Sequence, residues 1–199
     1  MALVVLSSGG VDSTVISVLA SRSGIVTHPL FIDYGQLCSA REWAACQYVH
    51  RRLRLPRPRK MDVRGYGALI PSGLTSRNRR IKEDAFLPGR NLLFCLCGAA
   101  YAYGLGVQSI ALGLLDDSSA IYPDQTRAFV ESAEKAIHQA FGYHISVTAP
   151  LIEVPKSKVL RIASEMKISG TYSCHAGSKS PCGKCVSCLE FRRSTEGRS

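Results

Sequence analysis

The chain has 199 residues, of which 46% are hydrophobic and 20% charged, an ordinary composition for one soluble globular domain with a sizeable core. No stretch approaches the roughly 20 apolar residues of a membrane span, and the first apolar run stops at Ser7 without a preceding basic segment. We therefore expect no membrane contact, no signal peptide and a cytoplasmic location. The net charge of +10 suits anionic partners such as nucleotides, nucleic acid or acidic small molecules, but it also fits a solvated basic face over 51–60 and 77–82.

Strand-like and helix-like patterns alternate along the chain. Strands are expected at 2–6, 25–34, 60–63, 107–115 and 144–151. Helices are expected at 12–22, 39–53, 91–106, 125–141 and 156–167, the one at 91–106 being apolar on nearly all sides and so buried. The alternation predicts an α/β fold with an open, doubly wound, parallel five-stranded sheet. We expect this domain to span 1–170 and a cysteine-rich element at 171–193 to pack on it.

The stretch between 64 and 90 has no clear period. It is rich in Gly, Pro, Arg and Ser. A loop of this length is usually functional or mobile.

The loop SSGGVDST, residues 7–14, joins the first strand to the first helix. Ligands of an open parallel sheet bind at the carboxyl ends of its strands, and glycines followed by a helix N-terminus suit an anion. Asp12 would repel a phosphate unless it held Mg²⁺ or capped the helix. The loop is neither a Walker P-loop nor a nucleophile elbow, because it lacks Gly-Lys-Ser/Thr and G-x-S-x-G. A simple turn capped by Asp12 remains the alternative.

Four of the eight cysteines cluster near the end of the chain, with seven, two and two residues between them: Cys174, Cys182, Cys185 and Cys188. Two overlapping C-x-x-C steps, with Gly183 allowing a tight turn, can present four thiolates to one tetrahedral ion. Four sulfurs favour zinc, with an iron–sulfur cluster or scattered free thiols as the alternatives. A disulfide reading is poor for a cytosolic protein. His175 is a bystander or a substrate contact. The other four cysteines are interpreted as ordinary reduced thiols.

The first loop resembles the S-G-G-x-D-S signature of the PP-loop ATP pyrophosphatase superfamily, whose members bind ATP and activate a substrate oxygen by adenylation. Further landmarks follow in order and together resemble the 7-cyano-7-deazaguanine synthase (QueC) family from Leu6 to about Arg193: FIDYGQ at 31–36, LPGRN at 87–91, YPD at 122–124, APL at 149–151 and TYSCHAGSKSPCGKCVSC at 171–188. The resemblance implies an adenine nucleotide alpha hydrolase-like fold with a C-terminal four-cysteine loop that binds structural zinc beside the cleft. It also suggests a homodimer.

The implied reaction converts 7-carboxy-7-deazaguanine and ammonia to 7-cyano-7-deazaguanine, in queuosine biosynthesis. ATP and Mg²⁺ are used, and an adenylated carboxylate and an amide are the intermediates. The expected partners are therefore ATP, ammonia, a deazaguanine carboxylate and a second copy of the chain, and nucleic acid is not required. The protein mainly positions groups and stabilises phosphate charge.

Site residues follow from the resemblance. Asp12 orients the first loop or holds Mg²⁺, Arg90 binds a phosphate or carboxylate, and Lys156 reaches phosphate, and these three are the expected catalytic residues. Asp124 could pair with the amidine-like edge of a deazaguanine. Asp33 is expected at the nucleotide sugar or a loop, with a turn-stabilising role as the alternative. The residues expected to contact the nucleotide are Ser7, Ser8, Gly9, Gly10, Asp12, Ser13, Asp33, Asn91 and Asp124.

Three departures from the family pattern lie near the expected substrate pocket. Cys38 stands where the family usually has His, Gln125 follows YPD where Cys is common, and LLDDSSAI at 114–121 replaces an N-x-x-D run. They concern the acceptor rather than the ATP chemistry. Two alternatives to the implied reaction stay open. One is a QueC-like paralogue that activates a different carboxylate or joins a deazapurine to another amine. The other is a zinc-ribbon nucleic-acid-binding protein, which the net charge fits but the dispersed basic residues do not.

Overall fold

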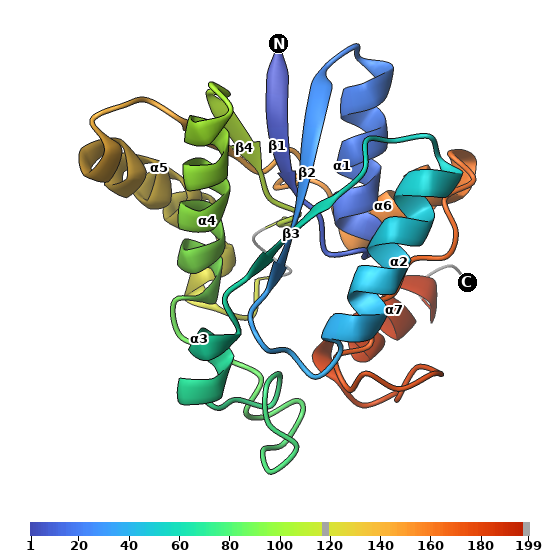
Figure 1. The fold of residues 1–199 in the computed structure, drawn as a ribbon. Helices are drawn as coiled ribbons and strands as arrows, with labels where there is room; N and C mark the ends of the chain where they lie inside the picture. The colour runs from blue at the N-terminus through green and yellow to red at the C-terminus, as the bar shows by residue number, and fades with distance from the viewer. Residues whose placement is uncertain (117–119, 197–199) are drawn as a thin grey trace.

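A single parallel sheet forms the centre of the protein, whose computed structural model describes residues 1–116 and 120–196 (Figure 1). The sheet has five strands in the order β3-β2-β1-β4-β5, and every neighbouring pair is parallel. The strands are β1 (Ala2–Leu6), β2 (Val26–Asp33), β3 (Arg59–Asp62), β4 (Ser109–Ala111) and β5 (Ser146–Thr148). The expected fold class is therefore confirmed.

The strand order reverses beside β1. From β1 the chain builds outward through β2 and β3, then crosses back to add β4 and β5 on the other side. Crossovers leave β1 in opposite directions at this point, so the loops that follow β1 and β4 diverge and leave a crevice at the carboxyl ends of the strands. The loop that carries the SSGGVDST stretch is therefore at the place where such sheets bind ligands.

Helices cover both faces of the sheet (Figure 1). One layer holds α1 (Val11–Arg22), α2 (Ser39–Arg52) and α6 (Lys156–Glu165), and the other holds α4 (Arg90–Gly104) and α5 (Arg127–Phe141). Shorter elements are α3 (Arg64–Leu69), the 3-10 turn Pro123–Gln125, and α7 (Val186–Glu196), which packs near α6. No helix in the described ranges is long and apolar enough to cross a membrane.

The alternating side chains of β1 explain why both faces need a helical layer. Val4 packs in the cluster with α4 and α5, while Leu3 and Val5 pack in the cluster with α1 and α6. Val4 and Val5 are completely buried. A continuous apolar run is what a strand needs when neither face meets water.

Several expected elements differ from those observed. Helix α4 was expected to be buried, but it is buried on one face only, and Leu92 and Leu96 on its other face are 43% and 45% exposed. Strands β4 and β5 have three residues each, shorter than expected, and after β4 the chain leaves the sheet to line the first cavity with Leu112, Gly113 and Leu114. The irregular stretch contains α3, and the cysteine-rich tail ends in α7. Residues 117–119 of the LLDDSSAI stretch lie outside the described residues.

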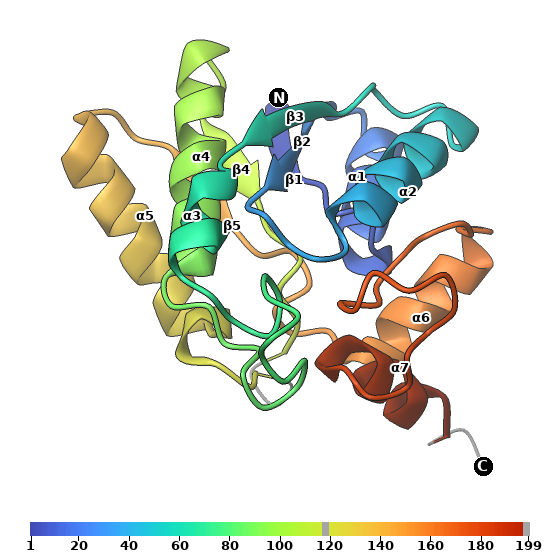
Figure 2. The same ribbon diagram turned by 60° about the horizontal axis from the view of Figure 1, so that its bottom comes forward.

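The tail returns to the carboxyl end of the sheet, where Figure 2 shows it beside the first loop. The Tyr172 main-chain N–H donates to the Gly9 carbonyl at 3.0 Å. Gly9 has φ +80°, and a Cβ there would lie 2.5 Å from the Glu42 carbonyl oxygen. The loop is thus held tightly between α2 and the tail.

Replacing Gly9 with alanine should destabilise the protein more than the matched change Gly24→Ala. Both residues have positive φ, but a Cβ at Gly24 would meet nothing within 4 Å. We expect a loss in unfolding free energy of about 1 kcal/mol for Gly24→Ala, from backbone strain alone. For Gly9→Ala we expect about 1–3 kcal/mol more, from the backbone clash. Urea unfolding measures both, and equal losses would contradict the packing described here.

Candidate functional site

Two adjoining cavities open at the carboxyl ends of the strands. The first, of about 260 Å³, lies over the ends of β1, β2 and β4 and reaches the N-terminus of α4. The second, of about 210 Å³, lies between the first loop, the 121–125 segment and the tail. Six residues line both cavities and so mark their boundary: Ser8, Asp12, Glu42, Arg90, Gln125 and His175.

The first loop is ordered by its own hydroxyl groups. The Ser8 main-chain N–H donates to Ser13 Oγ at 3.2 Å, and Thr14 Oγ1 donates to the Gly10 carbonyl at 2.7 Å. Helix α1 follows at once, with Gly10 as its extended N-cap and no side chain capping it. The structure therefore leaves the N-terminus of α1 uncapped at the crevice, where its N–H groups favour an anion.

Asp12 forms an ion pair rather than a cap. Both of its carboxylate oxygens accept hydrogen bonds from Lys156 Nζ, at 2.8 and 2.7 Å. Lys156 is the first residue of α6, is 9% exposed, and lies 3.7 Å from Glu190 of α7. Burial raises the pKa of Glu190, against the opposing charge of Lys156. One ammonium group thus joins the first loop, α6 and the tail. Because no side chain caps α1, the alternative that Asp12 caps a simple turn is wrong.

Arg90 lies at the first residue of α4, directly after Gly89, whose φ is +71°. Its guanidinium carbon is 6.0 Å from the centre of the Tyr34 ring and 5.9 Å from that of Phe94. The Nε atom is buried without a hydrogen-bond partner in the described part of the chain. The two ring centres are only 5.3 Å apart, so both rings lie on one side of the guanidinium and leave donors for a bound anion.

Two further buried polar atoms near Arg90 lack partners among the described residues, Asp124 Oδ1 and His175 Nδ1. The other oxygen of Asp124 accepts from the Asn91 main-chain N–H at 3.3 Å, and the Asn91 amide donates to the Asp124 carbonyl at 2.7 Å. Asp124 therefore holds the start of α4. Unpaired buried polar atoms are costly, and Arg90 and His175, which line both cavities, indicate a place where a ligand completes the hydrogen bonding.

Glu42 reaches the cavity boundary from α2. Its Oε2 accepts from Gln36 Nε2 at 2.9 Å. Burial raises the pKa of Glu42, although hydrogen bonds from Gln36 and Cys38 and the charge of Arg90 act in the opposite direction. Sequence reasoning missed this residue. A signal was present, because Glu42 is three and four residues before Ala45 and Cys46, which form the buried face of α2.

Asp33 lies outside both cavity linings. Its carboxylate pairs with Lys60 at 2.7 Å and accepts from the Gly35 main-chain N–H at 3.2 Å. Its neighbours Ile32 and Tyr34 line the first cavity instead. Side chains alternate at the end of β2, so the Asp33 side chain points away from the first cavity. Its partners lie in β3 and in the following turn.

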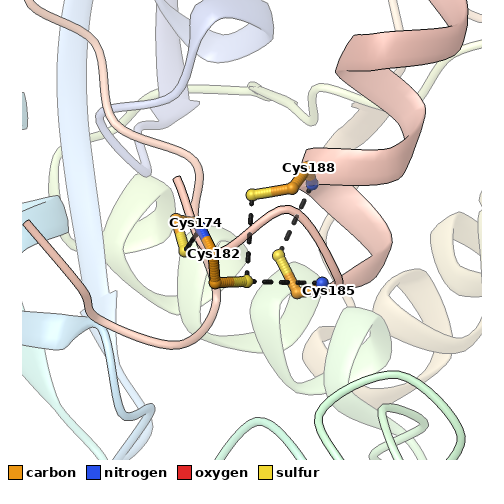
Figure 3. A group of neighbouring side chains, drawn as sticks. All are labelled: Cys174, Cys182, Cys185 and Cys188. Carbon is orange, nitrogen blue, oxygen red and sulfur yellow. Dashed lines mark hydrogen bonds between the residues drawn. The ribbon is translucent and has the colours of Figure 1, made fainter. Parts of the chain in front are cut away.

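The four tail cysteines form one compact cluster, drawn in Figure 3. Their sulfur atoms all lie within 4.8 Å of one another, and Cys182 Sγ is 4.0 Å from Cys188 Sγ. A tetrahedral zinc with bonds of about 2.3 Å would separate its sulfurs by roughly 3.8 Å, so the cluster fits one metal ion. Main-chain N–H groups already point at sulfur, as from Cys185 to Cys182 and from Cys188 to Cys185.

The thiols of the cluster differ in acidity. Burial opposes ionisation of Cys174, but hydrogen bonds from Ser178 and from the Cys182 main chain outweigh it and lower the pKa of Cys174 to about 6. Burial raises the pKa of Cys185 to about 12. A bound cation would be needed to hold all four as thiolates. The remaining cysteines, Cys38, Cys46, Cys95 and Cys97, are free and buried.

The structure gathers most, but not all, of the expected site residues. Those that line the first cavity are Ser7, Ser8, Asp12, Ser13, Arg90 and Asn91. Gly10 and Lys156 line the second, while Gly9, Asp33 and Asp124 line neither. Besides Glu42, sequence reasoning missed three cavity residues: Gln36, which follows β2, and Tyr172 and Glu190, whose positions depend on how the tail folds back.

Known proteins similar to this chain were found by sequence and by structure. The 7-cyano-7-deazaguanine synthase 1 of Desulfitobacterium hafniense is 31% identical, over 98% of this chain and 91% of that protein. The 7-cyano-7-deazaguanine synthase of Campylobacter concisus is 29% identical, over 93% of this chain and 89% of that protein.

Two solved structures share the fold. A predicted subunit of a tRNA methyltransferase from Methanocaldococcus jannaschii has a TM-score of 0.56 and 19% identity, covering 83% of this chain and 75% of that one. The U34-tRNA thiolase NcsA from Methanococcus maripaludis has a TM-score of 0.56 and 14% identity, covering 98% and 65%. The family model described as "Queuosine biosynthesis protein QueC" matches residues 2–196, and the chain therefore belongs to the QueC family.

Proposed function

We propose that this protein is an ATP-dependent carbon–nitrogen ligase that converts 7-carboxy-7-deazaguanine and ammonia to 7-cyano-7-deazaguanine. The observation that carries the proposal is the shared wall of the two cavities at Ser8, Asp12 and Arg90. A nucleotide in one cavity and a carboxylate in the other would meet there. Adenylation requires the two substrates to be in contact, since a carboxylate oxygen must reach the α-phosphorus of ATP.

The first cavity suits the nucleotide. Its far end is apolar, with Leu30, Phe31 and Leu112 among its lining residues, as a flat base requires. Its near end is the first loop, where main-chain N–H groups and the hydroxyls of Ser8 and Ser13 would bind phosphate. Lys156 would neutralise the pyrophosphate leaving group. The Asp12 carboxylate has the oxygen ligands that Mg²⁺ prefers, and the ion would offset phosphate charge.

The second cavity suits the acceptor. The planar Arg90 guanidinium at its boundary would bind the acceptor carboxylate through two hydrogen bonds. The carboxylate oxygen attacks the α-phosphorus and pyrophosphate leaves. Ammonia then attacks the carbonyl carbon and AMP leaves, which gives the amide. A second ATP activates the amide oxygen, and loss of AMP with two protons gives the nitrile.

The tail would bind zinc through Cys174, Cys182, Cys185 and Cys188 as a structural ion, because four protein ligands leave no open position for water. Lys179 and Lys184 would offset the charge of the tetrathiolate. The metal would then fix the chain between Tyr172 and Glu190, which supplies one wall of the second cavity.

A paralogue acting on another acceptor is the second candidate. Gln125 lines both cavities, and its Oε1 accepts from the main chain of Ile121 and Tyr122 at 2.8 and 3.0 Å. It therefore shapes the acceptor wall at a position where the family pattern differs. Mass spectrometry after incubation with ATP, Mg²⁺, ammonia and 7-carboxy-7-deazaguanine separates the two: the amide and then the nitrile should form. ATP binding without either product would favour the second candidate.

Asp12→Ala should abolish formation of the nitrile while the protein stays folded, because Lys156 keeps Glu190 as a partner. Product formation by mass spectrometry and the thermal unfolding midpoint are the two measurements. Asp62→Ala is the matched control, since Asp62 pairs with Arg64 on the surface and should leave turnover unchanged. Turnover of Asp12→Ala at the rate of the unaltered protein would rule out the proposed role.

Arg90→Lys keeps the charge but loses the bidentate pair of N–H donors. Turnover should therefore fall about 10²-fold with little change in the unfolding midpoint. Arg161→Lys, on the exposed side of α6, serves as the control. The steady-state rate with saturating ATP and ammonia tests this. An Arg90→Lys variant as active as the control would mean that the guanidinium does not bind the acceptor.

One zinc ion per chain is expected from elemental analysis. The double variant Cys185→Ser, Cys188→Ser should lose the metal and become less soluble, because metal binding is part of the folding free energy. Cys97→Ala removes a buried sulfur from α4, outside the cluster, and should retain the metal. Full zinc occupancy in the double variant would show that these cysteines are not the ligands.

A further inference from the structure

The amide-forming step needs a group that takes a proton from the incoming nitrogen, and the structure indicates which one. This inference rests on the proposed function. The reacting carbonyl carbon is bonded through oxygen to the α-phosphorus, so it would lie where the nucleotide and acceptor cavities meet. A base for the nucleophile must therefore come from the six boundary residues.

Five of the six are unsuited to the task. Ser8 and Gln125 carry no basic group, and Arg90 remains a cation. Both oxygens of Asp12 are held by Lys156. His175 follows the metal ligand Cys174 directly, and its main-chain N–H bonds to the sulfur of Cys185, so it belongs to the frame of the cysteine cluster.

Glu42 remains, and its setting suits a base. It lines both cavities from α2, as Arg90 does from α4 and His175 from the tail. One oxygen accepts from Gln36 Nε2, whose amide also donates to the Ile32 carbonyl and so is fixed in direction. The carboxylate therefore has a set orientation. No lysine or arginine lies within ion-pair distance of Glu42 in the described part of the chain.

Burial supports the same role. It raises the pKa of Glu42, which makes the carboxylate a stronger base than one in water. The neighbours that act on it are Gln36 and Cys38 through hydrogen bonds, Arg90 through its positive charge, and Asp33 through its negative charge. The unpaired His175 Nδ1 offers a second contact for a small polar molecule at the boundary.

We propose that Glu42 is the catalytic residue that binds ammonia at the boundary of the two cavities and accepts its proton. As the bond from nitrogen to the carbonyl carbon forms, the bond from that carbon to the AMP oxygen breaks. AMP leaves with the electron pair of that bond. The proton moves from nitrogen to the Glu42 carboxylate and then to water, so that acyl adenylate and ammonia give amide, AMP and one proton.

The test compares Glu42→Gln with the unaltered protein in two reactions. Exchange of labelled pyrophosphate into ATP, driven by 7-carboxy-7-deazaguanine, reports adenylation and needs no ammonia. Amide formation across an ammonium series reports the next step. We expect exchange in Glu42→Gln to stay within about twofold, and amide formation at saturating ammonium to fall about 10²- to 10⁴-fold. Glu131→Gln, an exposed position on α5, is the matched control and should change neither.

Hydroxylamine supplies a further readout, because it is neutral and nucleophilic at neutral pH and depends less on a base. For Glu42→Gln, the fold decrease in the rate of hydroxamate formation should be less than a tenth of the fold decrease in the rate of amide formation. A variant that is merely misfolded would lose exchange, amide and hydroxamate together. If Glu42→Gln is insoluble, Glu42→Asp keeps the carboxylate at a shorter reach and should show a smaller loss of the same kind.

Amide formation by Glu42→Gln at the unaltered rate, or an equal loss of exchange and amide formation, would overturn the assignment of Glu42. The absence of exchange in the unaltered protein would be a different result. It would overturn the proposed adenylation of this acid, and the assignment with it.

Discussion

The ion pair between Asp12 and Lys156 joins residues that are 144 positions apart in the sequence. Asp12 lies in the first turn of the helix after the central strand, and Lys156 begins the last helix that covers the sheet. Because Lys156 also lies 3.7 Å from Glu190, the same ammonium orients α7. A buried charge in such a place is stable only when it is paired, so the folding of the tail and the geometry of the first loop depend on each other.

The cysteine cluster acts on the same arrangement from the other side. The four cysteines lie outside both cavity linings. The chain between and beside them nevertheless supplies Tyr172, His175 and Glu190 to the second cavity. A tail of this kind has little apolar surface of its own to bury. A metal ion held by four sulfurs can replace the missing core, which explains why a structural ion would be needed so close to the reacting groups.

The two cavities are lined by both cations and carboxylates. Arg90 and Lys156 are the cations of the two cavities, and Asp12, Glu42 and Glu190 are carboxylates. Both proposed substrates are anions, and Arg90 is the cation whose donors its protein partners leave open. Arg90 lies against two aromatic rings and has no close ion pair in the described part of the chain, which keeps its donors available.

The sequence by itself determined the α/β class, the five parallel strands and the group of four cysteines, and all of these are confirmed as structure. These features are local: side-chain periodicity and short spacings carry them. Helical spacing puts Glu42 near the buried face of α2, but the tertiary structure alone decided that Asp12 pairs with Lys156, that Asp33 turns to Lys60, and that a cavity boundary lies beside Glu42. Each of these outcomes depends on which distant segment packs against the residue, and no local pattern in one sequence encodes that contact.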